Sequence, residues 1–388
     1  MKEYCIYCIW NGGKPFIQGT YKTLDSAKVT LFDIISLEEE RQRPYYVDND
    51  FFENRYPYVG RLKYFCIKER EITKFLNTPA IISDDTQMTL FTANGLIWRE
   101  TRGALKGIAP MPSDAVYRAY LDWLDTQYNE NKHDSISWIK NVEALNHQRA
   151  PGNTCIGALS SGIKGTIDKP INDSKGCGGI MRVAPVGLYM NNSEIAGKFG
   201  ADVGAITHGH PLGIIPCYVF STLIYFLVNE NISIKDALNK ALKQYEEKFD
   251  IFDKEYKQYF LQLTKKAIEL SEKNISDIEA IKEIGEGWVA EETFAIAIYA
   301  CLKYSNDFEN AIICSINHDG DSDSTGSVAG NIIGASLGYS NIPSYYKDNI
   351  ELKDIILELS DDLSVHVPVS EYSTNDDKKW IEKYLYCR

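Results

Sequence analysis

Helical periodicity runs from residue 113 to the end of the chain and most limits the folds it can adopt. Apolar residues recur there at the three- and four-residue spacing of amphipathic helices. The segment 289–302 is apolar nearly all round, which indicates a central buried helix. We therefore expect a mainly α-helical bundle. The expected helices span residues 113–129, 194–206, 212–229, 233–248, 252–273, 288–304, 325–338 and 377–386.

The first seventy or so residues follow a different pattern. Residues 4–10 and 15–21 alternate as strands around an Asn-Gly-Gly turn, a helix is expected at 23–40, and a third strand at 62–67. Residues 68–79 are the expected link. The chain thus divides into a small α+β extension, 1–75, and a helical domain, 76–388. Cys5 and Cys8 have zinc-ligand spacing, but no second pair accompanies them, so a zinc site is disfavoured.

A turn rich in acids and hydroxyls precedes the helix expected at 325–338. Asp321 and Asp323 place two carboxylates two positions apart, and Ser324 or Thr325 can add a neutral oxygen. Such hard oxygen donors suit Mg²⁺ or Mn²⁺ better than Zn²⁺. The same residue types also cap ordinary helices, so the spacing alone leaves both interpretations open. Glycines at every fourth position then line one face of the helix, where a neighbour can approach: Gly326, Gly330 and Gly334.

Two other interpretations of this turn are weaker. An EF-hand lacks the required Gly and the distant Glu. An aspartate-nucleophile phosphatase built on Asp321 should follow an apolar strand, but polar Asn317, His318 and Asp319 precede the turn.

A second acidic turn lies more than two hundred residues upstream. Ser83, Asp84 and Asp85 stand at a predicted helix start, and the apolar residues that follow repeat at helical spacing. One acid would cap this helix, and an acid-rich first turn also favours the helix dipole. Two adjacent acids with hydroxyls exceed what a cap requires, and like charges this close call for a cation.

Three glycines in four residues, Gly176, Gly178 and Gly179, form a turn in the middle of the chain. Its N–H groups can converge on phosphate oxygens, although such a run is often only a tight turn. Lys175 and Arg182 are nearby cations that could offset the chain's overall negative field. Further on, residues 207–211 (Thr-His-Gly-His-Pro) end a helix, and a cap followed by Pro is favoured there over metal ligation.

Composition excludes several classes of partner. The formal net charge of −13 over 388 residues opposes nucleic acid or an anionic membrane as the main partner. No signal peptide opens the chain, and no apolar run reaches membrane-spanning length. Nine scattered cysteines without framework spacing predict a reducing cytoplasm.

Four motifs in this order resemble the ADP-ribosylglycohydrolase family, which includes the dinitrogenase reductase-activating glycohydrolase. They occupy residues 82–88, 174–182, 207–211 and 320–324, and residues 287–292 look like the family's central helix. The resemblance covers about residues 78–340. It implies an all-α orthogonal bundle with a binuclear centre of two Mg²⁺ (or Mn²⁺) ions.

The resemblance also implies roles for individual residues. The glycine turn would hold the pyrophosphate of ADP-ribose, His208 would lie beside the ligand, and Asp85 and Asp323 would be catalytic. The implied metal ligands are Ser83, Asp84, Asp85, Asp321, Asp323 and Ser324, and the implied substrate-binding residues are Ser174, Lys175, Gly176, Cys177, Gly178 and His208.

Two departures from the family pattern stand out. The usual Gly-Asp-x-x-Gly helix and its following glutamate do not precede Ser83, and acids at 38–40 are the candidates to replace them. Asp319 stands where a glycine is usual. In some bacterial toxin-immunity pairs, a relative uses an N-terminal extension to plug an ADP-ribosyltransferase toxin, and the extension here is similar in position.

Two functions follow as hypotheses. The first is a hydrolase that removes ADP-ribose from modified protein side chains, arginine foremost, and so reverses an ADP-ribosyltransferase. The second is an immunity protein or ADP-ribose-binding protein that blocks an ADP-ribosyltransferase toxin through residues 1–75 with weak or no turnover.

Overall fold

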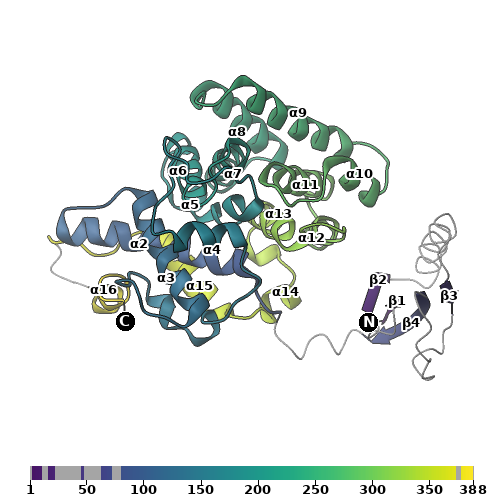
Figure 1. Cartoon of the computed structure of the whole chain (residues 1–388), viewed down its shortest axis with the longest axis horizontal. Helices are drawn as coiled ribbons and strands as arrows, with labels where there is room; N and C mark the ends of the chain where they lie inside the picture. The colour runs from purple at the N-terminus through teal and green to yellow at the C-terminus, as the bar shows by residue number, and fades with distance from the viewer. Residues whose placement is uncertain are drawn as a thin grey trace. The chain divides into compact units, whose positions relative to one another are not determined.

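The chain forms two compact units, Met1–Pro79 and Ala80–Arg388. The computed structural model describes the backbone of residues 2–10, 16–21, 45–47 and 63–71 in the first unit, and residues 80–372 and 377–387 in the second (Figure 1).

The described part of the first unit is a four-stranded sheet of order β2-β1-β4-β3. Its strands are β1 (Lys2–Trp10), β2 (Phe16–Tyr21), β3 (Tyr45–Val47) and β4 (Lys63–Glu71). β1 runs antiparallel to both β2 and β4, whereas β3 runs parallel to β4. The link expected from residue 68 is wrong at its start, because the ladder between β1 and β4 continues to the pair Lys2 and Glu71. The expected hairpin turn and the helix at 23–40 lie outside the described residues.

The second unit is mainly helical, as expected, in the part of it that the structure describes. Its longer helices are α2 (Asp84–Lys106), α3 (Pro112–Tyr128), α6 (Ser193–Ala205), α7 (Pro211–Glu230), α8 (Ile234–Lys248), α9 (Lys254–Ser271), α11 (Ala290–Lys303), α13 (Ser322–Leu337) and α15 (Lys353–Val365). The shorter ones are α4 (Asn153–Ser160), α5 (Ala184–Tyr189), α10 (Asp277–Ile284), α12 (Phe308–Ile316), α14 (Ser344–Asp348) and α16 (Lys378–Tyr384).

Helix α7 lies at the centre of this unit and packs against α5, α6, α8 and α11 (Figure 1). Its most apolar 18-residue window has a mean hydropathy of 1.9, so by length and composition this 20-residue helix is a candidate membrane span, contrary to our expectation that no apolar run is long enough. Of its most apolar window, however, 83% is buried inside the unit. Its neighbours therefore cover the apolar surface that made the sequence of α7 ambiguous.

Only one of the three glycines on the face of α13 is closely approached by a neighbouring helix, whereas all three were predicted to allow such an approach. A Cβ on Gly326 would lie 2.6 Å from Cγ2 of Ile316 in α12, so a larger residue there would have to displace that side chain. At Gly330 and Gly334 the nearest atoms are 3.6 and 3.9 Å away, which is ordinary contact distance. The close approach is thus to α12, at one position.

Candidate functional site

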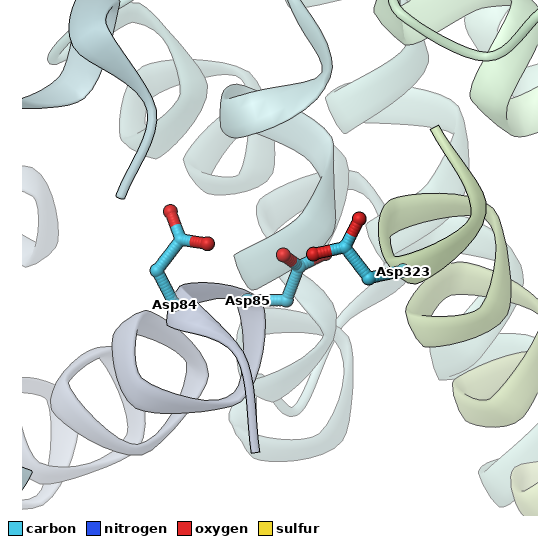
Figure 2. A group of neighbouring side chains, drawn as sticks. All are labelled: Asp84, Asp85 and Asp323. Carbon is cyan, nitrogen blue, oxygen red and sulfur yellow. The ribbon is translucent and has the colours of Figure 1, made fainter. Parts of the chain in front are cut away.

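Three carboxylates from two distant helices meet in the second unit. One carboxylate oxygen each from Asp84, Asp85 and Asp323 lies within 4.8 Å of the others. Asp84 and Asp85 begin α2 and Asp323 lies in the first turn of α13 (Figure 2). The two acidic turns, separated by more than two hundred residues, therefore meet.

The first acidic turn is held by a neighbouring loop. The N–H of Asp84 donates to the carbonyl of Arg149 at 2.9 Å, and Oδ2 of Asp84 accepts from the N–H of Gly152 at 3.1 Å. The hydroxyl of Ser83 donates to Oδ2 of Asp85 at 3.2 Å. Oδ1 of Asp85 is buried and has no hydrogen-bond partner among the described residues. That orphaned oxygen is what an absent ligand atom would leave.

The second acidic turn is held by a loop that precedes α11. The N–H of Asp321 donates to the carbonyl of Glu286 at 2.8 Å, and Oδ2 of Asp321 accepts from the thiol of Cys177 at 2.7 Å. Thr325 donates to the carbonyl of Ser315 at 2.7 Å, which fixes the start of α13. Asp321 and Ser324 are buried, while Asp323 is exposed. The turn therefore presents one accessible carboxylate above a buried one.

The carboxylates of the two acidic turns repel one another, and most of them are buried. Burial, followed by the repulsion of Asp323, raises the pKa of Asp84 to about 6. Burial also raises the pKa of Asp85 well above its ordinary value, and Asp84 raises it further. The pKa of Asp321 rises to about 6, because of burial and the neighbouring Asp323. A divalent cation bound by these oxygens would offset both the cost of burial and the repulsion between carboxylates. The donor set therefore fits Mg²⁺ or Mn²⁺.

The glycine turn is held by hydrogen bonds from its backbone N–H groups to neighbouring residues. It opens a short 3₁₀ helix, η4 (Cys177–Arg182). The N–H of Cys177 donates to the carbonyl of Trp288 at 3.2 Å, and that of Gly176 donates to the hydroxyl of Ser174 at 3.3 Å. The N–H of Ser174, just before the glycines, donates to Oδ1 of Asn172 at 3.1 Å. Three N–H groups of residues 174–178 therefore already have partners within the protein.

The two predicted cations near this turn differ in their environment. Lys175 forms an ion pair with Glu291, a buried residue in the first turn of α11. Arg182 is fully buried, donates to Thr207 at 2.5 Å and lies 4.4 Å from the ring centre of Tyr120. Arg182 is therefore part of the core and cannot offset charge at the surface, contrary to expectation.

His208 lies directly beneath the glycine turn. Its Nε2 is 3.3 Å from where a Cβ on Gly176 would stand, and its Cε1 is 3.0 Å from a Cβ on Gly178. Burial lowers the pKa of His208 to about 3, with a further contribution from Arg182. The ring is consequently neutral and supports the turn from below. The segment 207–211 follows the end of α6 as expected, because the N–H groups of Thr207 and His208 donate to the carbonyl of Gly204 at 3.4 and 3.2 Å. His210 then caps the start of α7.

One loop, residues 286–290, connects these parts, although its sequence gave no sign of this role. Residues 286–290 pair with the glycine turn through the carbonyl of Lys175, which accepts from Ala290 at 2.9 Å, and with the second acidic turn through Glu286. In the sequence, residues 287–292 only resembled the family's central helix. Arg149, Gly152 and Glu291 were also missed, since nothing in their spacing relates them to the acidic turns.

Comparison with known proteins identifies the family of this chain. A sequence model of the family ADP-ribosylglycohydrolase matches residues 36–372. The chain belongs to the ADP-ribosylglycohydrolase family. The match begins within the first unit and includes the acidic run at 38–40, which lies outside the described residues.

Individual relatives are distant. Human ADP-ribosylhydrolase ARH3 is 25% identical over 197 residues, which cover 46% of this chain and 54% of the relative. ADP-ribosyl-[dinitrogen reductase] glycohydrolase of Rhodospirillum rubrum is 21% identical, over 52% of this chain and 60% of its own. ADP-ribosylarginine hydrolase Tri1 of Serratia proteamaculans is 24% identical, over 61% of each chain. The chain thus spans about half the length of the ARH3 relatives that it matches.

A solved structure also resembles this chain. It is described as an ADP-ribosylglycohydrolase-related protein complex, with a TM-score of 0.45, 18% identity, and coverage of 73% of this chain and 98% of the other.

Proposed function

We propose that this protein is a metal-dependent hydrolase that removes ADP-ribose from modified protein side chains, arginine foremost, and so reverses an ADP-ribosyltransferase. The observation that carries the proposal is the meeting of three carboxylates from α2 and α13 within 4.8 Å. Family membership supports the release of ADP-ribose, and the relative named as an ADP-ribosylarginine hydrolase supports arginine.

The oxygen ligands of two Mg²⁺ or Mn²⁺ ions would come from both acidic turns. When bound, such ions polarise a water molecule and bind hydroxyl groups of a sugar. The proposed ligands are Ser83, Asp84, Asp85, Asp321, Asp323 and Ser324. Of these, Asp84, Asp85 and Asp323 form the carboxylate cluster.

Asp85 and Asp323 are the proposed catalytic residues. Oδ2 of Asp85 accepts from Ser83, whereas its Oδ1 is unpartnered and is therefore the atom available to take a proton from water. Asp323 is exposed and can stand beside C1″, where a carboxylate stabilises the positive charge that develops as the glycosidic bond breaks. The hydroxyl of water joins C1″, and the side-chain nitrogen leaves with a proton.

The glycine turn is the proposed pyrophosphate site. The remaining N–H groups of residues 174–178 and the ammonium group of Lys175 would contact the phosphate oxygens. Lys175 keeps 38% of its side chain exposed despite its ion pair with Glu291, so it can reach a ligand. His208 would hold the turn in shape from beneath.

The test is release of ADP-ribose from an arginine-ADP-ribosylated protein in the presence of Mg²⁺ or Mn²⁺, followed by chromatography. We expect release by the wild type and a loss of at least a hundredfold in Asp323→Ala, a magnitude typical of a group acting on the reacting atoms. Asp319→Ala is the matched control, because Asp319 is an exposed acid of the same turn that lies outside the carboxylate cluster. Substrates modified on serine test the choice of linkage in the same assay. Absence of release from every substrate would refute the hydrolase proposal.

A second candidate is an immunity or ADP-ribose-binding protein that blocks an ADP-ribosyltransferase toxin. One observation favours it, namely that Met1–Pro79 form a compact unit of their own. It predicts tight binding of the toxin that is lost on deletion of residues 1–75, with no dependence on Asp323. Binding that survives the deletion would exclude it.

A further inference from the structure

The loop that holds Asp84 is itself anchored by a residue from far along the chain. Oε1 of Glu351 accepts from Nη2 of Arg149 at 2.7 Å, and Oε2 of Glu351 accepts from the N–H of Ile82 at 3.2 Å. One carboxylate therefore joins the segment before the first acidic turn to the loop beside it.

The backbone around this carboxylate is paired as well. The N–H of Glu351 donates to the carbonyl of Ala80 at 2.9 Å, and the N–H of Ala80 donates to the carbonyl of Asn349 at 2.5 Å. Ala80 and Ile350 form a parallel bridge. Ala80 and Ile82 are thus both held by residues 349–351, before the chain enters α2.

The loop from Arg149 to Gly152 is strained, which indicates that its position is imposed. Ala150 has a φ of 57°, in the left-handed region that costs a residue with a side chain about 1–2 kcal/mol. Such a conformation persists only where the surroundings determine it. Here Asp84 determines it twice, through the Arg149 carbonyl and the Gly152 N–H, and Glu351 determines it through the Arg149 side chain.

We propose that Arg149 and Glu351 are positioning residues that hold Ser83, Asp84 and Asp85 in place opposite Asp323. The part of this proposal that concerns metal binding rests on the function proposed above. Neither residue belongs to the carboxylate cluster, and their side chains are only 22% and 16% exposed. The ion pair acts through Asp84, whose main chain and carboxylate both bond to the loop that Arg149 begins.

The first experiment is hydrogen exchange, followed by mass spectrometry, on the full chain. We expect the amides of Ile82 and Asp84 to exchange about tenfold faster in Glu351→Ala and Arg149→Ala. The amide of Ile82 donates to the Glu351 carboxylate, and the amide of Asp84 donates to the Arg149 carbonyl, which the ion pair holds in place. Glu351→Gln keeps an acceptor and should rescue much of the protection, and it remains informative if the alanine variants fold poorly. Asp348→Ala is the matched control, because it removes the exposed pair with Lys353 in the same segment. Unchanged exchange at Ile82 and Asp84 would overturn the proposal.

The second experiment is titration with Mn²⁺ alone, which needs no turnover. We expect the Kd for Mn²⁺ to rise about tenfold in Glu351→Ala and Arg149→Ala and to stay unchanged in Asp348→Ala. Faster exchange with an unchanged Kd would refute a role in positioning the metal ligands. A wild-type protein that binds no Mn²⁺ would instead refute the metal-dependent function, and the exchange experiment would then decide by itself whether the pair holds the turn.

Discussion

The thiol of Cys177 donates a hydrogen bond to Oδ2 of Asp321 across 2.7 Å, although the two residues are 144 positions apart. This contact joins the glycine turn directly to the second acidic turn. Burial, and then the negative charge of Asp321, raise the pKa of the Cys177 thiol well above its ordinary value. The sulfur is therefore a neutral donor and not a nucleophile.

Cys177 should accordingly be replaceable by another donor but not by an apolar residue. Cys177→Ser retains a hydroxyl that can donate to Asp321, whereas Cys177→Ala leaves that buried oxygen without a partner. We expect kcat/KM for ADP-ribose release to fall about tenfold in the alanine variant and much less in the serine variant, as for a hydrogen bond to a charged group. Equal losses in both variants would show that sulfur itself is required.

Removing only Lys175 from its ion pair with Glu291 should destabilise the protein more than replacing both residues. Lys175→Met leaves the fully buried Glu291 carboxylate without its cation, so we expect a loss of roughly 2–3 kcal/mol in the free energy of unfolding. Adding Glu291→Gln to that variant should recover most of the loss, which urea unfolding would measure. The control is Lys265→Met, from an exposed pair with Glu269, which should cost less than about 1 kcal/mol. A double variant no more stable than Lys175→Met would contradict this account.

The helices predicted best from the sequence were those with a long amphipathic or apolar repeat. The apolar segment 289–302 became α11, and the start of α2 at Asp84 followed from its acids and the apolar face beyond them. The short helices α4, α5, α10, α12 and α14 were missed, as was α15 (13 residues). A helix of two turns or so contains too few positions to show a period, and tertiary packing determines whether it forms.

The candidate site was predictable only as separate motifs. Asp84 and Asp323 each stand in a turn with more acids than a cap requires, and that excess charge was the signal that they share a site. Arg149 and Glu351 gave no signal, because a positioning residue is defined by its partners in space. Arg182 gave a misleading one, since a cation near a phosphate-like turn is expected at the surface and this one lies in the core against Tyr120.

The pKa shift of Asp84 predicts how metal-free protein responds to pH. The native pKa of about 6 exceeds the ordinary 3.8, so the folded protein binds the proton more tightly than the unfolded chain does. Ionisation of Asp84 therefore destabilises the fold as pH rises from about 4 to 6, by roughly 2–3 kcal/mol in total. We expect Asp84→Asn to be more stable than wild type at pH 7 in EDTA, and the advantage to shrink toward pH 4. Thermal unfolding at both pH values measures it, and a constant difference would contradict the assigned cause.

Gly320 should be the least replaceable glycine of the second acidic turn. A Cβ there would lie 1.8 Å from the carbonyl oxygen of Glu286, the same oxygen that accepts from the N–H of Asp321. Gly320→Ala must therefore displace the loop that carries Asp321, and we expect a loss of about 2–4 kcal/mol in stability together with weaker Mn²⁺ binding. Gly330→Ala, in helix α13, is the matched control, because its new methyl group meets only Cδ1 of Ile312 in α12, at 3.6 Å. That variant should gain up to about 1 kcal/mol from helix propensity. If Gly320→Ala bound Mn²⁺ as tightly as Gly330→Ala does, the fixed position of Asp321 would not matter for the metal.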